Sequence, residues 1–415
     1  MKIIADLHIH SKFSRATSRE MDIPNIAQWA KIKGINLIGT GDFTHPLWLS
    51  ELKGYLKPLH YGIYEHDGVY FFLSGEVNNI YFKNGQTRKI HNIILAPDFK
   101  TVEKINSKLT AYGELYSDGR PILSLDSQDL TKIVLDINPN CLIIPAHIWT
   151  PHFSLFGENS GFNSIEECFD KDTKNIYALE TGLSSDPAMN WRLSSLDRFT
   201  LVSNSDAHSV QRLGREVNVF DVNDYRDLYK EITEIIRTKD RKKFLYTIEF
   251  FPEEGKYHYD GHRNCKLRMH PREALANNDL CKICNRKVTV GVLHRVEELA
   301  DRAEDYIPTN AIPFKNLIPL EEIIASALNV TRSSQMVNFE YKKLVNHFGN
   351  EFEVLLESKI EDLEKITQPK VALGIIKVRE GKVLVNPGYD GVYGEIKILF
   401  EEEIKREETE QLSLF

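Results

Sequence analysis

Short apolar segments alternate with helical segments along the first 250 residues. Each apolar segment is rich in Ile, Leu, Val or aromatic residues, which is typical of a buried parallel strand. The seven predicted strands are residues 2–5, 36–40, 70–73, 90–95, 141–145, 177–179 and 199–203. Between the first two, the sequence predicts a helix that begins at Asp22 or Pro24 and ends at Gly34. This alternation over ~200–250 residues predicts an α/β fold, either a barrel of parallel strands surrounded by helices or a relative of it.

The pattern changes after about residue 250. Phe251-Pro-Glu-Glu-Gly255 has the composition of a linker, and a segment that contains Cys and His follows it. Helices are predicted within residues 296–306, 320–328 and 338–363, and a β-hairpin is predicted from residues 371–378 and 382–385. We therefore expect four parts: a barrel over 1–245, a small module over 250–300, a helical region with a hairpin over 301–400, and an acidic tail over 401–415.

Composition excludes several classes of protein. The 415 residues are 42% hydrophobic and 27% charged, which argues against a disordered or fibrous chain. No apolar stretch approaches the ~18 residues of a membrane span, and no secretory leader is visible. Five cysteines, an odd number, do not form a disulfide framework, which predicts the reducing cytoplasm. The net charge of −8 argues mildly against non-specific nucleic-acid binding, but residues 256–295 hold nine basic and only three acidic side chains.

Candidate metal ligands follow almost every predicted strand, where parallel barrels carry their chemistry. His8 and His10 lie two residues apart on an extended segment, so both point to one side, and Asp206 and His208 repeat that spacing. The mixture of imidazoles and carboxylates favours Zn, Mn or Fe over Ca or Mg alone. The candidates are His8, His10, Asp42, His45, Glu76, His91, His147, Glu180, Asp206 and His208.

Not every candidate needs to bind an ion. Asp42, His45 and Glu180 could instead support neighbouring ligands, and Asp6 is better explained as a supporting carboxylate. Glu76 could bridge two ions. Two or three ions ~3.5–4 Å apart stabilise the oxygens of a phosphoryl displacement and generate hydroxide near neutral pH. The set therefore predicts a metal-dependent phosphoesterase.

A second metal site is predicted after the linker. His262-x2-Cys265 and Cys281-x2-Cys284 form two chelating pairs, a pattern that resembles a zinc ribbon. His258 and, less well, His270 are rivals for His262, and a redox pair is the alternative for the last two cysteines. Cys141 and Cys168 are predicted to be small core residues.

The chain ends in Gln411-Leu-Ser-Leu-Phe415 after ten residues that include six Glu. This pentapeptide matches the motif with which bacterial proteins bind the DNA sliding clamp. Leu412, Leu414 and Phe415 would be the hydrophobic anchors and Gln411 would supply a polar contact. The alternative is an apolar end without a partner.

The strand-end motifs resemble those of the PHP (polymerase and histidinol phosphatase) superfamily. The matching residues are Asp6-Leu-His8-Ile-His10-Ser11, Glu76, His91, His147 and Asp206-Ala-His208, in the superfamily's order. The resemblance implies a distorted (β/α)7 barrel with three ions. One ion would bind His8, His10, Glu76 and Asp206, the second Glu76, His91 and His147, and the third His208 with Asp42 or His45.

Two departures from the superfamily pattern concern the third ion. The usual Thr-Asp-His motif is replaced by Thr40-Gly-Asp42-Phe-Thr-His45, and residues 12–20 contain no further histidine.

Almost the whole chain also resembles the endonuclease Q family. The matching stretches include Gly41-Asp-Phe-Thr-His-Pro-Leu-Trp48, Tyr257-His-Tyr-Asp-Gly-His262 through Cys265, and Val288-Thr-Val-Gly-Val-Leu-His294-Arg-Val-Glu-Glu-Leu299. The resemblance implies a DNA repair endonuclease that nicks the phosphodiester 5′ to deoxyuridine, deoxyinosine, deoxyxanthosine and abasic sites. The expected metals are Zn²⁺ in the module and in the barrel, with Mg²⁺ or Mn²⁺ for activity.

The hypothesis for the reaction is attack by metal-activated hydroxide next to a flipped-out nucleotide, with His8, His10, Glu76, Asp206 and His208 as the catalytic set. The damaged base would enter a pocket formed by Tyr81, Phe82, Trp149 and His152. The predicted DNA-binding residues are Lys12, Ser14, Arg15, Arg263, Lys266, Arg268, Lys282 and Arg286. The expected setting is a cytoplasmic, nucleoid-associated monomer that binds DNA and the sliding clamp.

Three alternatives remain at this point. A PHP-type 3′-5′ DNA exonuclease would share the fold and the metal ligands. A small-molecule phosphatase would have little use for the zinc module and the terminal motif. A catalytically dead, clamp-tethered DNA-binding module is disfavoured because most of the ligands are present.

Overall fold

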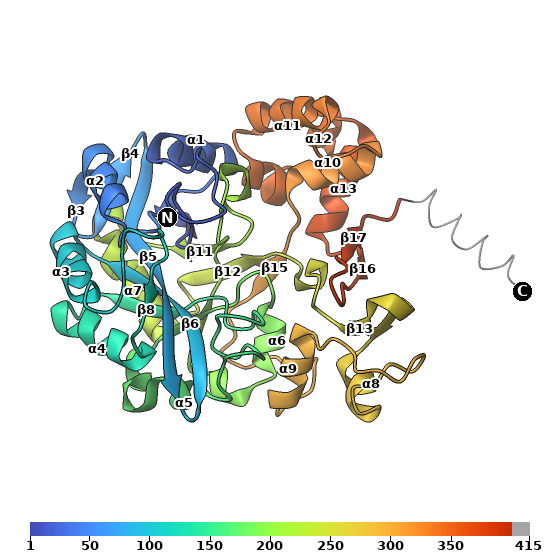
Figure 1. The fold of residues 1–415 in the computed structure, drawn as a ribbon. Coiled ribbons are helices and arrows are strands. Elements are labelled where there is room, and N and C mark those ends of the chain that lie inside the picture. The colour runs from blue at the N-terminus through green and yellow to red at the C-terminus, as the bar shows by residue number, and fades with distance from the viewer. Residues whose placement is uncertain (401–415) are drawn as a thin grey trace, which may run out of the picture.

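The computed structural model describes residues 1–400 as a mixed α/β fold (Figure 1). The prediction of an α/β chain is therefore confirmed. The acidic segment 401–410 and the terminal motif lie outside the described residues. No helix of the described chain combines the length and apolar character needed to cross a membrane.

All seven predicted strands overlap observed strands. Three of them run parallel in the order β1 (Lys2–Asp6), β2 (Leu37–Gly39) and β5 (Val69–Lys83). The next two, β6 (Gln86–Ala96) and β8 (Leu142–Pro145), continue the sheet.

The expectation of uniformly parallel strands is wrong at this point of the sheet. β5 pairs antiparallel with β6, and β6 pairs antiparallel with β8. The cause is local: β5 is 15 residues long and continues from its predicted end at residue 73 to Lys83, then returns through the tight turn Asn84-Gly85, where both residues have positive φ. A short turn can join only antiparallel strands.

The remaining two predicted strands, β9 (Ala178–Glu180) and β10 (Thr200–Val202), form a separate parallel pair. Backbone hydrogen bonds link this pair to the sheet on both sides. The amide of Ile148, just after β8, donates to Glu180 at 3.0 Å, and the amide of Asp206, after β10, donates to His8 at 3.0 Å. The polar segments that follow the strands therefore meet at one place.

Further strands extend the sheet at both edges. β1 also pairs antiparallel with β11 (Val217–Asp221), which continues to β12 (Phe244–Glu249) and β15 (Phe314–Asn316). The other additions are β3 (Lys57–His60), β4 (Ile63–His66) and β7 (Ile122–Leu123).

Helices connect the strands and pack on the outside of the sheet (Figure 1). α1 (Ile23–Lys33) has the predicted ends: the side chain of Asp22 accepts the amide of Asn25, and Gly34 ends the helix at φ 90°. The others are α2 (Pro46–Tyr55), α3 (Phe99–Leu109), α4 (Ser127–Ile137), α5 (Ile165–Phe169), α6 (Pro187–Trp191) and α7 (Leu228–Thr238).

A small lobe follows the sheet. It contains β13 (Asp260–His262), β14 (Leu267–Met269) and α8 (Pro271–Ala276), and α9 (Val292–Leu299) leads out of it. Its own core consists of only four buried residues: Met269, Ala274, Cys281 and Val288. So small a core stabilises a fold only weakly without a cross-link or a metal.

The last part is helical, as predicted, except for the position of the hairpin. The helices are α10 (Leu320–Leu328), α11 (Gln335–Phe348), α12 (Ile360–Ile366) and α13 (Pro369–Arg379), with a π-helical turn at Glu353–Glu357. The predicted strand 371–378 is therefore wrong. Pro369 favours a helix start, and Val371, Ile375 and Val378 recur at helical spacing and are buried. The strand pair lies later, at β16 (Leu384–Asn386) and β17 (Glu395–Lys397).

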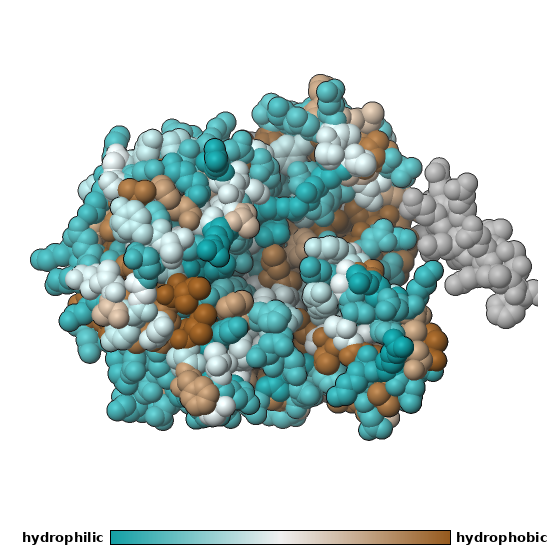
Figure 2. Space-filling model, viewed as in Figure 1, coloured by the Kyte–Doolittle hydropathy of each residue, from teal (hydrophilic) through white to brown (hydrophobic). Residues whose placement is uncertain are grey.

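These parts enclose a cleft. Residues of α6, of the small lobe around His258 and His270, and of the β16 region (Val385, Pro387) line a cavity of about 500 Å³. Figure 2 shows that the face in this view is mostly hydrophilic. It is hollowed between the part that holds the large sheet, on the left, and the small lobe and the helical last part, on the right.

Candidate active site

Four predicted ligands meet at one place: His8 and His10 follow β1, Asp206 follows β10, and Glu76 lies within β5. One ligand atom from each of His8, His10, Glu76 and Asp206 lies within 4.8 Å of the other three. His10 Nε2 is 3.1 Å from Glu76 Oε2 and 3.0 Å from Asp206 Oδ1. The Nε2 atoms of both histidines and Oδ1 of Asp206 are buried and make no hydrogen bond. Buried polar atoms without partners are costly, and a cation would satisfy all three.

Three residues form a second group that shares Glu76. His91 Nδ1 and His147 Nε2 lie 2.7 and 3.2 Å from Glu76 Oε1. The two oxygens of Glu76 therefore face different groups. These donor sets, histidine with carboxylate, fit two transition-metal ions bridged by Glu76.

Other carboxylates hold the ring nitrogens that face away from the two groups. His8 Nδ1 contacts Glu180 at 3.0 Å, and His10 Nδ1 contacts Asp42 Oδ1 at 3.0 Å. The other oxygen of Asp42 accepts the Ser11 amide and the hydroxyls of Ser11 and Ser14. Such contacts fix the orientation of a ligand histidine. The structure therefore places Asp42 behind His10 rather than among the candidate ligands.

The residues proposed for a third ion are not assembled. The ring of His208 lies 4.5 Å from that of His10, and its Nδ1 contacts the backbone oxygen of Asp206 at 2.8 Å. His45 stacks on Phe13 and accepts the amide of Trp48 at the start of α2. Within residues 1–400, Asp42, His45 and His208 belong to no group of three candidate ligands.

The pKa values of these side chains reflect a concentration of buried charge. Burial alone would lower the pKa of His8, but the carboxylates of Glu180 and Glu76 hold it well above its usual range. Burial would raise the pKa of Glu76, but His91, Arg120 and His8 hold it well below its usual range. Burial lowers the pKa of His91 to about 4. The low pKa of Glu76 favours its carboxylate, the form that binds metal ions.

One residue next to the two groups was missed in the sequence. Arg120 Nη1 lies 3.1 Å from Glu76 Oε2. Arg120 precedes β7, which has only two residues and gives no strand pattern to mark the loop before it. The sequence offered no local signal for this contact.

The predicted base-pocket residues lie in different environments. Trp149 is a core residue: it is 1% exposed, its ring centroid lies 4.8 Å from that of Phe156, and its indole N–H donates to Asn190. Trp149 is therefore not a candidate for contact with the damaged base. The Tyr81 hydroxyl contacts Ser127 and Cys168, whereas Phe82 is 75% exposed. His152 is exposed and adjoins Phe153, whose ring stacks 5.1 Å from His91.

The predicted DNA-binding residues are also spread out. Lys12 pairs with Glu51 at 2.8 Å, Ser14 donates to Asp42, and Arg15 is largely exposed next to Asp118. In the small lobe, Arg268 donates to the backbone oxygen of Pro387. Arg263, Lys266, Lys282 and Arg286 form no side-chain ion pair among the described residues.

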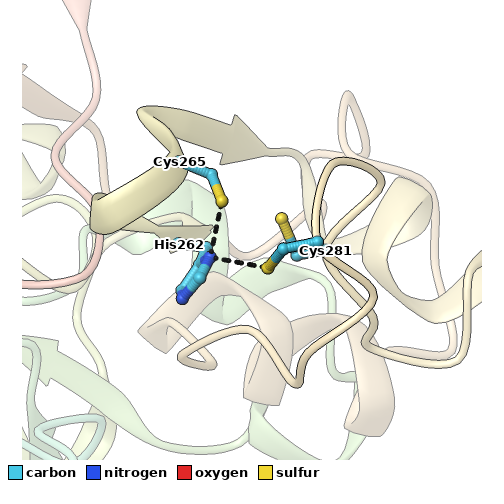
Figure 3. Close-up of side chains that lie close together, drawn as sticks. His262, Cys265 and Cys281 are labelled. Atoms are coloured by element: carbon cyan, nitrogen blue, oxygen red, sulfur yellow. Dashed lines mark hydrogen bonds between the residues drawn. The ribbon is translucent and has the colours of Figure 1, made fainter.

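The small lobe brings together the predicted zinc ligands His262, Cys265, Cys281 and Cys284, the first three of which are labelled in Figure 3. His262 Nδ1 lies 3.1 Å from Cys265 Sγ and 3.3 Å from Cys284 Sγ. Burial would raise the pKa of Cys281, but the amides of Cys284 and Ile283 lower it to about 6, which favours the thiolate that binds zinc. The rivals lie elsewhere: His258 is buried beside Tyr259, and His270 caps α8.

Comparison with known proteins decides the family. The chain is 34% identical to the lesion-specific endonuclease PfuEndoQ from Pyrococcus furiosus, with a TM-score of 0.87, covering 98% of this chain and 97% of the other. The Bacillus subtilis protein YqxK is 30% identical over 95% of this chain and 99% of its own length. The chain belongs to the endonuclease Q family.

Other matches agree with this assignment to endonuclease Q. A second structure, an endonuclease Q complex with a 27-mer duplex carrying an abasic lesion, matches with a TM-score of 0.85 and 34% identity over 98% of both chains. Residues 319–382 match the MJ0043 C-terminal domain family. The Methanocaldococcus jannaschii protein MJ0043 is 34% identical over 60% of this chain but only 31% of its own length.

The family assignment confirms two predictions: the resemblance to endonuclease Q and the expectation of a metal-dependent DNA endonuclease. The roles of individual residues remain predictions.

Proposed function

We propose that the chain is a repair endonuclease that nicks DNA 5′ to deaminated bases and abasic sites. The observation that carries the proposal is the pair of ligand groups bridged by Glu76, within a chain that matches a lesion-specific endonuclease over almost its full length. The complex of a relative with an abasic duplex supports the abasic part of the substrate range. Deoxyuridine, deoxyinosine and deoxyxanthosine are proposed from the family resemblance.

The proposed architecture is a distorted seven-stranded PHP barrel over 1–245, a zinc module over 250–300, and a helical region with a strand pair to residue 400. The backbone links of β9 and β10 to their neighbours support the barrel. The four clustered ligands of the small lobe support structural zinc. The terminal motif Gln411–Phe415 would bind the sliding clamp.

The barrel ions would supply Lewis acidity and an activated water to the phosphodiester. His8, His10, Glu76, Asp206, His91 and His147 would hold them, with His208 at the edge of the site. Asp42 and Glu180 keep His10 and His8 in the tautomer that presents Nε2 to the ligand groups. The chain's own contribution is thus a fixed array of ligands at one phosphate.

The damaged nucleotide would leave the stack to reach these buried groups, since His8, His10 and Glu76 are at most 2% exposed. Tyr81, Phe82 and His152 remain the candidates for contact with the flipped base. Lys12, Ser14 and Arg15 after β1, and Arg263, Lys266, Arg268, Lys282 and Arg286 in the small lobe, would contact the DNA backbone.

The decisive experiment uses a closed circular duplex with one deoxyuridine, deoxyinosine or abasic site, and an undamaged circle as the control. With Mn²⁺ or Mg²⁺, we expect one cut directly 5′ to the lesion and no cut in the control. Digestion of linear DNA without cutting of the circle would instead indicate the exonuclease alternative. Asp206→Ala should abolish nicking while DNA binding persists, which would exclude a dead binding module.

A further inference from the structure

Arg120 lies at the bridging carboxylate although no predicted role accounts for it. Its Nη1 lies 3.1 Å from Glu76 Oε2, the oxygen that also faces His10 at 3.1 Å. The side chain keeps 25% of its surface exposed, whereas that of Glu76 is fully buried. The Arg120 side chain therefore contacts the bridging carboxylate and is also partly open to solvent.

The loop that carries Arg120 is built against the ligand array. The amide of Arg120 donates to Asp118 Oδ1 at 3.1 Å, and the amide of Gly119 donates to the backbone oxygen of Phe13 at 3.1 Å. Thr44 Oγ1 donates to the backbone oxygen of Gly119 at 3.0 Å. A Cβ at Gly119 would lie 2.3 Å from Asp42 Oδ2 and 2.4 Å from Ser14 Oγ. The loop can approach so closely only because this position lacks a side chain.

The pairing of Arg120 with Glu76 changes once cations occupy the two groups. Glu76 would then be a ligand of the ions, and the Arg120 guanidinium beside them would be repelled unless a further anion lay between them. The anion available in the proposed reaction is a phosphodiester. Arginine matches phosphate oxygens with two parallel N–H donors, which a lysine cannot reproduce.

We infer that Arg120 binds a non-bridging oxygen of the scissile phosphate and so acts as a catalytic residue of the proposed nuclease. The inference rests on the proposed function for the identity of the substrate, but the phosphate contact itself is independent of lesion recognition. The alternative is that Arg120 only compensates the charge of Glu76 in the metal-free protein.

The test compares Arg120→Met and Arg120→Lys in the full chain, with Arg226→Met as the matched control. Arg226 is an exposed arginine that pairs with Asp224, remote in sequence from every ligand. For Arg120→Met we expect unchanged Mn²⁺ stoichiometry, a fall in nicking kcat of about 10²–10³-fold, and little change in KM. The kcat of Arg120→Lys should lie between those of Arg120→Met and wild type, because lysine keeps the positive charge but lacks the two parallel N–H donors of arginine.

A second readout does not depend on nicking. Methyl phosphate is titrated into the Mn²⁺-loaded proteins by calorimetry, and we expect at least a tenfold weaker affinity in Arg120→Met than in wild type and Arg226→Met. Unchanged phosphate affinity and kcat in Arg120→Met would overturn the inference. Loss of both bound Mn²⁺ and activity in Arg120→Met and Arg120→Lys would also overturn it, because Arg120 would then only hold the metal ligands in place. If wild type binds methyl phosphate through Arg120 but does not cut the lesion circle, the proposed function fails and the phosphate contact stands.

Discussion

At the scale of single residues, the site depends on which atom of each side chain is left free. Asp42 receives three donors from Ser11 and Ser14 on one oxygen and contacts His10 with the other. This arrangement leaves His10 Nε2 without a hydrogen bond among the described residues. Substitutions of the residues that contact the ligand histidines, such as Asp42, are therefore as informative as substitutions of the ligands themselves.

Asp42→Asn should weaken metal binding without removing a ligand. The amide keeps the shape but loses the charge that holds His10, so we expect a 10–100-fold loss of Mn²⁺ affinity. Equilibrium dialysis measures the effect, with Asp67→Asn, at an exposed ion pair with Lys31, as the control. Equal affinity in Asp42→Asn and wild type would contradict the supporting role.

Glu249 should make the stability of the fold depend on pH. Its carboxyl is fully buried, and burial raises its pKa to about 7, although Thr247, Ser203 and Thr181 donate to it. Because the folded pKa is above the unfolded value of about 4.3, the folded state binds the proton more tightly, and stability falls as pH rises between these values.

Glu249→Gln replaces the titrating carboxyl with an amide that stays neutral. We therefore expect the Tm of the variant to exceed that of wild type at pH 8 and the difference to vanish near pH 4.5. The gain corresponds to about 1–3 kcal/mol. Thermal unfolding of both proteins across this range measures it. The control is Glu395→Gln, at an exposed position of β17, whose Tm should differ from that of wild type by the same amount at every pH. A Tm difference for Glu249→Gln that does not change with pH would contradict the prediction, because it would mean that the Glu249 carboxyl is already ionised at pH 5.

At the scale of elements, the small lobe shows how little of its stability comes from packing. Four buried residues form its core, and one of them, Cys281, is also a candidate zinc ligand. Metal-dependent modules of this size lose their fold without the ion.

Cys284→Ser should therefore unfold the small lobe and leave the rest of the chain folded. We expect loss of one equivalent of zinc and rapid proteolysis within residues 256–291, while the main unfolding transition stays within about 2 °C of wild type. Cys168→Ser is the control, since Cys168 is a buried cysteine outside the lobe. A variant that keeps its zinc and its protease resistance would count against the four-ligand site.

Elements also show where sequence patterns suffice. The seven strand segments were predictable because each is a continuous apolar run, and the ligand types either follow such a run or, like His91, lie within it. The helix at Pro369–Arg379 was missed because a short apolar run of eight residues, rich in Val and Ile, fits either a strand or one face of a helix. Arg120 could not be predicted because its contact joins the loop before β7 to Glu76 within β5, and the two residues share no local sequence pattern.

At the scale of the whole molecule, the proposal links a nuclease to a clamp through the end of the chain. Deletion of residues 411–415 should leave nicking of a short lesion duplex unchanged and abolish stimulation by the sliding clamp on a long circle, because the motif would act only as a tether. Rates on both substrates, with and without clamp, measure this. Ser413→Ala, which retains the three proposed anchors and the polar Gln411, is the control. Clamp stimulation that survives the deletion would contradict the tether.

The link between β1 and the segment after β10 has a consequence for the newly made chain. His8 leaves the ribosome early, yet its neighbour Asp206 follows almost 200 residues later, and their backbones are hydrogen-bonded. At typical rates of synthesis the first histidines wait about 10–40 s for the partner that completes their group. During that interval the growing chain displays histidines without their full set of carboxylates, so the order of translation itself delays the moment at which this nuclease can become active.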